Sequence, residues 1–234
     1  PVFDFDVEHR IPLRLYWAVV LLGVILGILG VLYNKLLDKM QDFFDRFDSK
    51  FISIGIMFMI SFLMMFIYPT VLGSGNDLVK VISDGKFTLI ALAILLVAKL
   101  FFSTGSFGTG TPGGIFLPLL VIGAITGGLY STFLSTAFGV EEYYIKAFVI
   151  IAMAGFFSAI VRAPITGVIL ITEMTGNFMT LLSLVAASLA AYVVADLLGG
   201  EPVYDQLMHR RQRKKVESGS GTPDHDYLAD VYSK

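Results

Sequence analysis

The sequence has no cysteine and little charge. Without cysteine the chain forms no disulfide scaffold and no thiolate metal site, although this absence does not identify its redox compartment. Charged residues make up 15% of the chain, whereas an ordinary soluble domain carries about a quarter. The net charge of −2 gives no indication of a nucleic-acid partner. These shortages argue against a disulfide-rich domain, an ordinary soluble domain and a nucleic-acid-binding protein.

Metal-binding and catalytic patterns are missing from the sequence as well. The histidines His9, His209 and His225 are scattered in polar segments, so we expect no metal site. No Ser/His pair, paired aspartates or H-E-x-x-H segment occurs at catalytic spacing, so we expect neither an enzyme nor a cofactor. No signal peptide is visible, and the start at Pro1 is typical of a fragment or a processed piece.

Hydrophobic residues are in excess, at 56% of the chain with a mean hydropathy of +0.77. They recur in several long runs, which predicts an all-α, polytopic membrane protein. About 20 helical residues cross the hydrocarbon core of a bilayer. We therefore expect full spans at residues 13–37, 51–68, 87–102, 115–138, 144–161 and 178–198. Gly23, Gly27 and Gly30 lie near one face of the first span, where they allow close helix contact.

Other segments are too short or too polar to cross a membrane. Residues 70–86 and 164–175 predict short helices, and residues 103–114 predict a glycine-rich break. Such a mixture is typical of transporters, because irregular backbone at membrane depth survives only where it is buried or lines a cavity. The expected domains are an aqueous linker (1–12), a transmembrane region (13–200), an amphipathic helix with Tyr204 at its start (201–215) and a flexible tail (216–234). The basic residues after position 208 predict a cytoplasmic tail.

The glycine-rich segment 103–114 leads directly into a helix that we expect to begin near Ile115 and Phe116. The first amides of a helix have no intrahelical partner and lie at the positive end of its dipole, so they attract anions. Residues 108–113 also match G-x-G-x-x-G, but an apolar span precedes them and no acidic residue follows before Glu141, which argues against a dinucleotide site. A simple helix-breaking loop is the alternative.

Four ionisable residues lie in or beside apolar runs: Lys99, Arg162, Glu173 and Asp196. Charged groups are costly inside a membrane, so each is a candidate for function. Each also lies near a helix end or a glycine break, where partners are available. We therefore favour ion pairing or helix capping for these residues, and for Glu173 a functional role stays open.

Several segments together resemble the CLC family of chloride channels and transporters. The Gly-Ile-Phe-Leu-Pro segment at 114–118 is similar to the G-x-F-x-P signature of that family. Residues 160–167 resemble its R-A-P-hydroxyl-G segment, and residues 170–177 resemble its E-M-T segment. Residues 202–204 resemble the segment that supplies a central tyrosine, and the order of the segments agrees as well.

The resemblance implies one half of an inverted-repeat transporter fold with short, tilted and broken helices. It implies transmembrane chloride transport, as part of a voltage- or proton-coupled Cl⁻/H⁺ antiporter; a passive channel subunit and a non-transporting membrane scaffold are the alternatives. The backbone amides of Ile115 and Phe116 and the hydroxyl of Tyr204 would bind chloride, since a phenol donates one hydrogen bond and stays neutral at pH 7. Without the resemblance, Tyr204 is an interfacial anchor. The supporting loop residues would be Gly113, Gly114 and Pro118.

The resemblance also implies partners. A first half, absent from this sequence, would supply a chloride-binding serine and a gating glutamate, so the sequence does not separate exchanger from channel. We expect the chain to need that half in a cell membrane, to transport chloride and protons, and to form homodimers through residues 164–175 and 178–198. Small residues suit close packing in the second of these segments, namely Ala186, Ala187, Ala190 and Ala191.

Overall fold

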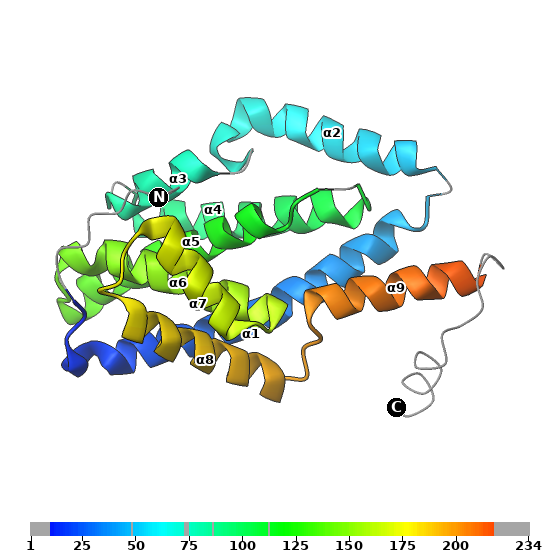
Figure 1. The fold of residues 1–234 in the computed structure, drawn as a ribbon. Helices are drawn as coiled ribbons and strands as arrows, with labels where there is room; N and C mark the ends of the chain where they lie inside the picture. Colours follow the sequence, from blue (N-terminus) through cyan, green and yellow to red (C-terminus); the bar gives the residue numbers. More distant parts are fainter. Residues whose placement is uncertain (1–9, 48, 73–74, 86, 112, 218–234) are drawn as a thin grey trace. The chain divides into compact units, whose positions relative to one another are not determined.

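The structure is a computed structural model that describes residues 10–47, 49–72, 75–85, 87–111 and 113–217. All regular elements in these ranges are helices, as predicted (Figure 1). The chain divides into two compact units, Pro1–Gly200 and Glu201–Lys234, which are described separately.

The first unit contains eight α-helices and three 3-10 turns within its described residues, and the second contains one α-helix. In chain order they are η1 (Leu13–Leu15), α1 (Tyr16–Phe44), α2 (Lys50–Ile67), η2 (Pro69–Val71), α3 (Asn76–Ser83), α4 (Leu89–Gly108), α5 (Phe116–Phe138), η3 (Glu142–Tyr144), α6 (Ile145–Val161), α7 (Pro164–Thr175), α8 (Leu181–Leu197) and α9 (Val203–Glu217). Five stretches are long and apolar enough to cross a membrane: Leu13–Phe44, Lys50–Ile67, Leu89–Gly108, Phe116–Phe138 and Glu142–Val161.

The helix α6 lies at the centre of the first unit and packs against α1, α5, α7 and α8. Nearly all of its residues are buried, which explains why it is apolar on every side. Glycines in α5 allow that helix to pack closely against α6. A Cβ atom at Gly127 would lie 2.6 Å from the carbonyl oxygen of Phe148, and one at Gly123 would lie 2.8 Å from that of Ala152. The two backbones therefore approach more closely than larger residues would allow.

The contact between α1 and α8 follows the same principle. A Cβ atom at Gly23 would lie 2.7 Å from the carbonyl oxygen of Ala187, and one at Gly27 would lie 2.8 Å from that of Ala191. Both alanines are fully buried. For Ala187 and Ala191, the close packing expected of small residues therefore occurs within the chain, against α1, so these two residues are not available for a dimer face.

The predicted break at residues 103–114 is wrong in its first half. The helix α4 continues through Gly108, so Gly105 is helical too. A Cβ atom at Gly105 would lie 3.1 Å from the sulfur of Met57, and one at Gly108 would lie 2.9 Å from Cβ of Met40. Because these glycines lack a side chain, α1 and α2 can pack close to α4. The chain turns at Gly110, which has a φ of 71°.

The first span is also longer than expected, since α1 continues to Phe44 and does not end near Leu37. The residues beyond position 37 alternate charge with apolar side chains, yet Gln41 and Phe44 are buried with Leu37 on the same face. This stripe at helical spacing keeps the segment helical against the core.

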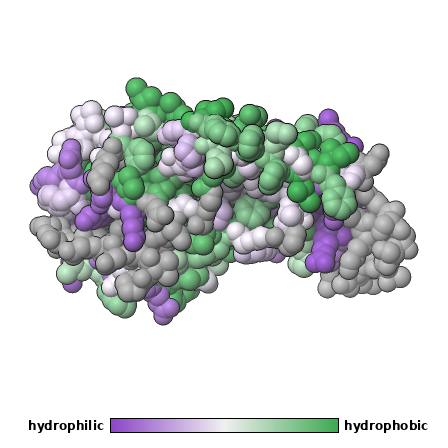
Figure 2. All heavy atoms as spheres, turned by 90° about the horizontal axis from the view of Figure 1, so that it is seen from above, coloured by the Kyte–Doolittle hydropathy of each residue, from purple (hydrophilic) through white to green (hydrophobic). Residues whose placement is uncertain are grey.

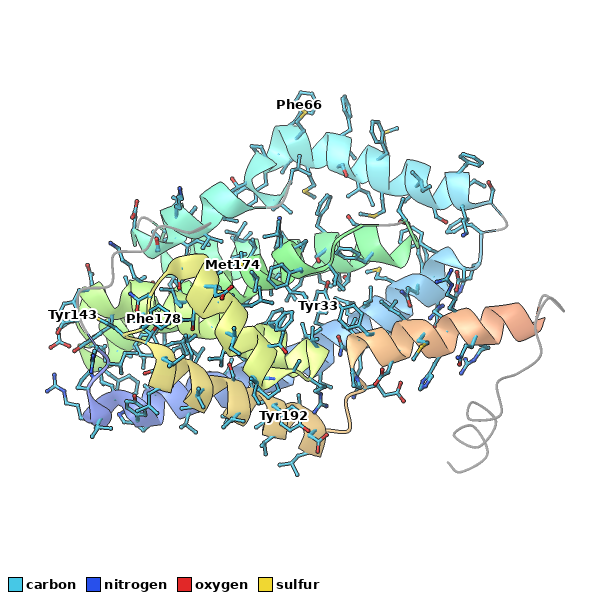
Figure 3. All side chains as sticks on the ribbon, in the orientation of Figure 1. Tyr33, Phe66, Tyr143, Met174, Phe178 and Tyr192 are labelled. Atoms are coloured by element: carbon cyan, nitrogen blue, oxygen red, sulfur yellow. The ribbon has the colours of Figure 1, made fainter. Side chains whose placement is uncertain are left out.

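The outer surface of the first unit carries large apolar side chains. On α2 only Ser53 and Met57 are buried, and Phe51, Phe58 and Phe66 are exposed by 86%, 75% and 72%. Phe66 points away from the neighbouring helices in Figure 3. Hydrophobic residues cover much of the face seen in Figure 2. Such a surface is suited to lipid or to other membrane segments rather than to water.

The contact between α5 and α6 gives a first prediction. Gly127→Ala places a methyl group against the α6 backbone and should lower the free energy of unfolding by about 1–3 kcal/mol. Thermal unfolding of the detergent-solubilised protein measures the change. Gly55→Ala in α2 is the matched control, because a Cβ atom there meets no described atom within 4 Å and alanine favours helix by about 1 kcal/mol. Equal unfolding temperatures for the two variants would contradict the close contact.

Candidate functional site

The helix α5 begins at Phe116 with Ile115 as its N-cap, as predicted. In the described part of the chain no side chain caps this end, and the first turn contains no acidic residue. Pro118 is the third helical residue and has no amide hydrogen, so the donors of the first turn are the amides of Ile115, Phe116 and Leu117. Since they lie at the positive end of the helix dipole, the arrangement attracts an anion without a full positive charge.

The start of α5 is held by the core of the first unit. The Phe116 ring packs edge-on against Phe157 of α6, with ring centroids 5.5 Å apart and planes at 82°. The Ile115 side chain is buried. Because α6 is itself enclosed by four helices, these contacts anchor the start of α5 to the core of the first unit.

Few described atoms lie close to the two glycines of the loop before α5. A Cβ atom at Gly114 would meet no described atom within 4 Å, and the nearest atom to one at Gly113 is Cε1 of Phe107, at 3.8 Å. Neither glycine has a positive φ. Backbone strain and packing within the described chain therefore do not explain these two glycines, and their role in supporting the site stays a prediction.

Tyr204 is the second residue of α9 and belongs to the second unit. The helix begins directly after Pro202, whose carbonyl accepts a hydrogen bond from the amide of Gln206 at 3.0 Å. The positions of the two units relative to each other are not determined. The assignment of Tyr204 as a chloride ligand therefore stays a prediction.

Three of the four ionisable residues of the membrane region, Lys99, Arg162 and Asp196, have partners of the structural kind that we favoured. Lys99 is buried, and its Nζ donates to the carbonyl oxygen of Val71 at 2.8 Å. The Arg162 guanidinium pairs with the Asp196 carboxylate at 3.2 Å. Glu173 lies exposed on α7, so its role stays open.

Some contacts between helices could not be predicted from the sequence. Tyr33 of α1 shares a hydrogen bond of 2.9 Å with Ser103 of α4, and its ring lies edge-on to Phe156 (Figure 3). Phe157 supports Phe116 across 41 positions of sequence. Hydropathy and spacing predict that such residues are buried, but they do not identify partners so far apart in the chain.

Known proteins are similar to this chain in sequence. The family described as voltage gated chloride channel matches residues 1–196. The H(+)/Cl(-) exchange transporter ClcA of Vibrio campbellii (strain ATCC BAA-1116) is 40% identical over 145 residues, which is 61% of this chain and 30% of the relative. The protein of the same name from Vibrio cholerae serotype O1 (strain ATCC 39541 / Classical Ogawa 395 / O395) is 39% identical over 142 residues, with the same shares.

The fold is shared as well. The crystal structure of a slow cyanobacterial Cl-/H+ antiporter matches 90% of this chain and 50% of its own with a TM-score of 0.81 and 27% identity. This chain thus spans about half of that antiporter and about a third of the curated relatives. Its apolar helices make it a multi-pass membrane protein. The resemblance read from its motifs is confirmed: the chain belongs to the CLC family of voltage gated chloride channels.

Proposed function

We propose that this chain is the second half of a chloride transporter that exchanges chloride for protons. The observation that carries the proposal is the uncapped start of α5, where the amides of Ile115 and Phe116 form part of a Gly-Ile-Phe-Leu-Pro segment. Relatives at 40% and 39% identity are named H(+)/Cl(-) exchange transporters, which supports exchange over a passive channel. Transport requires no bond to be made or broken, so we propose no catalytic residue and no cofactor.

In the proposed site, chloride accepts hydrogen bonds from the amides of Ile115 and Phe116 and from the hydroxyl of Tyr204. An anion leaving water loses its hydration shell, and these donors replace part of it. All three are neutral, so binding is strong enough to admit the ion and weak enough to release it. The remaining ligands and the proton pathway would come from a first half of the transporter.

We further propose that the complete transporter is a homodimer in the cell membrane, with a cytoplasmic tail. The outward faces of α7 and α8 support this, since Ile165, Ile169, Leu182 and Leu189 are exposed by 73%, 55%, 63% and 48%. Exposed apolar side chains on two helices that pack against each other are suited to contact with a second copy. The basic residues near the end of α9 favour the cytoplasmic side.

Tyr204→Phe tests the hydroxyl. Removing one donor to a charged ligand should cost about 1.5 kcal/mol, or about tenfold in chloride affinity. Calorimetric titration of chloride into the protein assembled with its first half measures the loss. Tyr68→Phe, at the end of α2, is the matched control and should leave the affinity unchanged. A Tyr204→Phe protein that binds chloride as tightly as the parent would remove Tyr204 from the site.

Gly114→Ala tests whether chloride occupies the space beside the loop before α5. The methyl group enters open space beside the Ile115 amide, so folding should be unaffected while chloride affinity falls about tenfold, the weight of one hydrogen bond to an ion. The same titration and a thermal unfolding curve measure the two effects. Gly55→Ala again serves as the control. Chloride binding equal to that of the parent would show that the space beside Gly114 is not used by the ion.

Flux measurements test the need for a first half. In liposomes, this chain alone should give no chloride flux above protein-free vesicles, because only one of the two helix sets that enclose the ion is present. Together with its first half it should move chloride with counter-movement of protons. Chloride flux without protons would favour the passive channel instead, and rapid flux by the chain alone would overturn the requirement for a partner.

A further inference from the structure

We propose that Phe157 of α6 is a positioning residue for the chloride-binding amide of Phe116, and that Gly167 of α7 leaves the room that its ring needs. The proposal rests on the chloride site proposed above, at the start of α5. It uses contacts among α5, α6 and α7, all of which belong to the first unit. It also gives a role to Gly167, the glycine of the R-A-P-hydroxyl-G segment.

The Phe157 ring lies against the first turns of two helices. Phe157 is only 5% exposed. Its ring packs edge-on against that of Phe116, the first residue of α5, with centroids 5.5 Å apart. A Cβ atom at Gly167, the fourth residue of α7, would lie 3.0 Å from Cδ1 of the same ring. One buried ring therefore connects the beginning of α7 with the beginning of α5.

Space, and not backbone conformation, explains the glycine at position 167. Its φ is not positive, so a larger residue could adopt the same backbone. A Cβ atom there would, however, lie 2.9 Å from Oγ of Ser158 and 3.3 Å from the carbonyl oxygen of Ala154, in addition to its contact with Phe157. Any side chain at this position must therefore displace groups of α6, and the Phe157 ring is one of them.

The connection between α6 and α7 keeps Gly167 close to Phe157. Only Arg162 and Ala163 separate the two helices, and the chain turns at Arg162, which has a φ of 64°. So short a connection leaves two packed helices little freedom to move apart. The amide of Gly167 donates to the carbonyl oxygen of Ala163 at 3.0 Å, which closes the first turn of α7. Gly167 is thus held against the last turns of α6, where Phe157 lies.

The ring contact acts on the amide because the amide nitrogen and the side chain of Phe116 share one Cα atom. Aromatic pairs favour an edge-on arrangement, here at 82°, which restricts how Phe116 rotates and therefore where its N–H points. A hydrogen bond weakens steeply when its angle at the hydrogen falls below about 120°. In the described part of the chain no side chain caps this helix end. Phe157 thus influences chloride affinity through the direction of one donor, without touching the ion.

Phe157→Leu removes the ring but keeps a buried apolar side chain. In a core residue without a role in binding, this change would lower only the stability of the protein. If Phe157 positions the amide, chloride affinity should fall as well, by up to about tenfold, the weight of one hydrogen bond to an ion. Gly167→Ala should also weaken chloride binding, because its methyl group displaces the ring.

The experiment uses the transporter assembled from this chain and its first half. Calorimetric titration of chloride and thermal unfolding are measured for Phe157→Leu, Gly167→Ala and the double variant. We expect both single variants to bind chloride more weakly than the parent. The double variant should bind no more weakly than Phe157→Leu alone, since the ring through which Gly167→Ala acts is gone. Two independent defects would instead give additive losses of chloride affinity.

Gly155→Ala is the matched control within α6. A Cβ atom there would lie 2.7 Å from Cδ1 of Leu26, so the variant crowds the same helix. Gly155 precedes Phe157 by two positions and therefore lies about 200° around the helix from it. We expect lower stability with parent-like chloride affinity. A loss of affinity as large as that in Gly167→Ala would show that any disturbance of α6 reaches the site, and would overturn the specific role of Phe157.

The remaining outcomes separate this inference from the proposed function. If the parent binds chloride and Gly114→Ala weakens binding while Phe157→Leu does not, the positioning role fails and the proposed site stands. Additive losses in the double variant would mean that Gly167 does not act through Phe157. An assembled parent that binds no chloride refutes the proposed function, and the inference falls with it. If Gly167→Ala does not fold, Phe157→Leu and Gly155→Ala decide the question, since leucine retains most of the apolar volume.

Discussion

Inside a bilayer there is no water to form hydrogen bonds with the backbone groups at a helix end. In this structure the partners of those backbone groups differ from one helix end to another. At the end of α8, the guanidinium of Arg162 donates to the carbonyls of Tyr192 and Ala195. At the start of α5, the amides of Ile115, Phe116 and Leu117 receive no side-chain cap in the described part of the chain. The carbonyl end has a cationic donor, whereas the amide end has no side-chain partner in the described chain and is of the kind that attracts anions.

Glycine has two opposite uses in this chain. At Gly127 and Gly23 the missing side chain is replaced at once by another backbone, so the residue makes a contact. At Gly114 a Cβ atom would meet no described atom within 4 Å, so the missing side chain makes no contact there. Sequence composition treats both alike, which is why the stretch before α5 was predicted to be irregular throughout. The residues that pack closely against Gly105 and Gly108, Met57 and Met40, lie far away in the sequence, so these contacts cannot be read from the composition of the glycine-rich segment.

Most helices could be predicted because hydropathy and length act locally. The short helix Pro164–Thr175 was expected at those residues, and the start of α5 lies where the motif predicts it. Contacts between side chains and distant segments could not be predicted in the same way. Phe157 packs against Phe116 of α5 and Arg162 donates to the carbonyl oxygen of Ala195 in α8, and a residue's own neighbours in sequence determine neither contact. Tyr204 was identified by resemblance alone, since a tyrosine at a membrane boundary has an ordinary explanation as an anchor.

The helices α2 and α6 differ in how much of their surface the described chain buries. Only Ser53 and Met57 of α2 are buried by the described chain, and the methionine meets Gly105 through a flexible thioether. The described chain thus encloses little of α2, whereas it encloses nearly all of α6. Replacements among apolar residues of different size are consequently absorbed along α2, while along α6 the same replacements must be matched by changes in neighbouring helices. The side chains of α2 therefore need above all to be apolar, whereas those of α6 must also match the shape of the core.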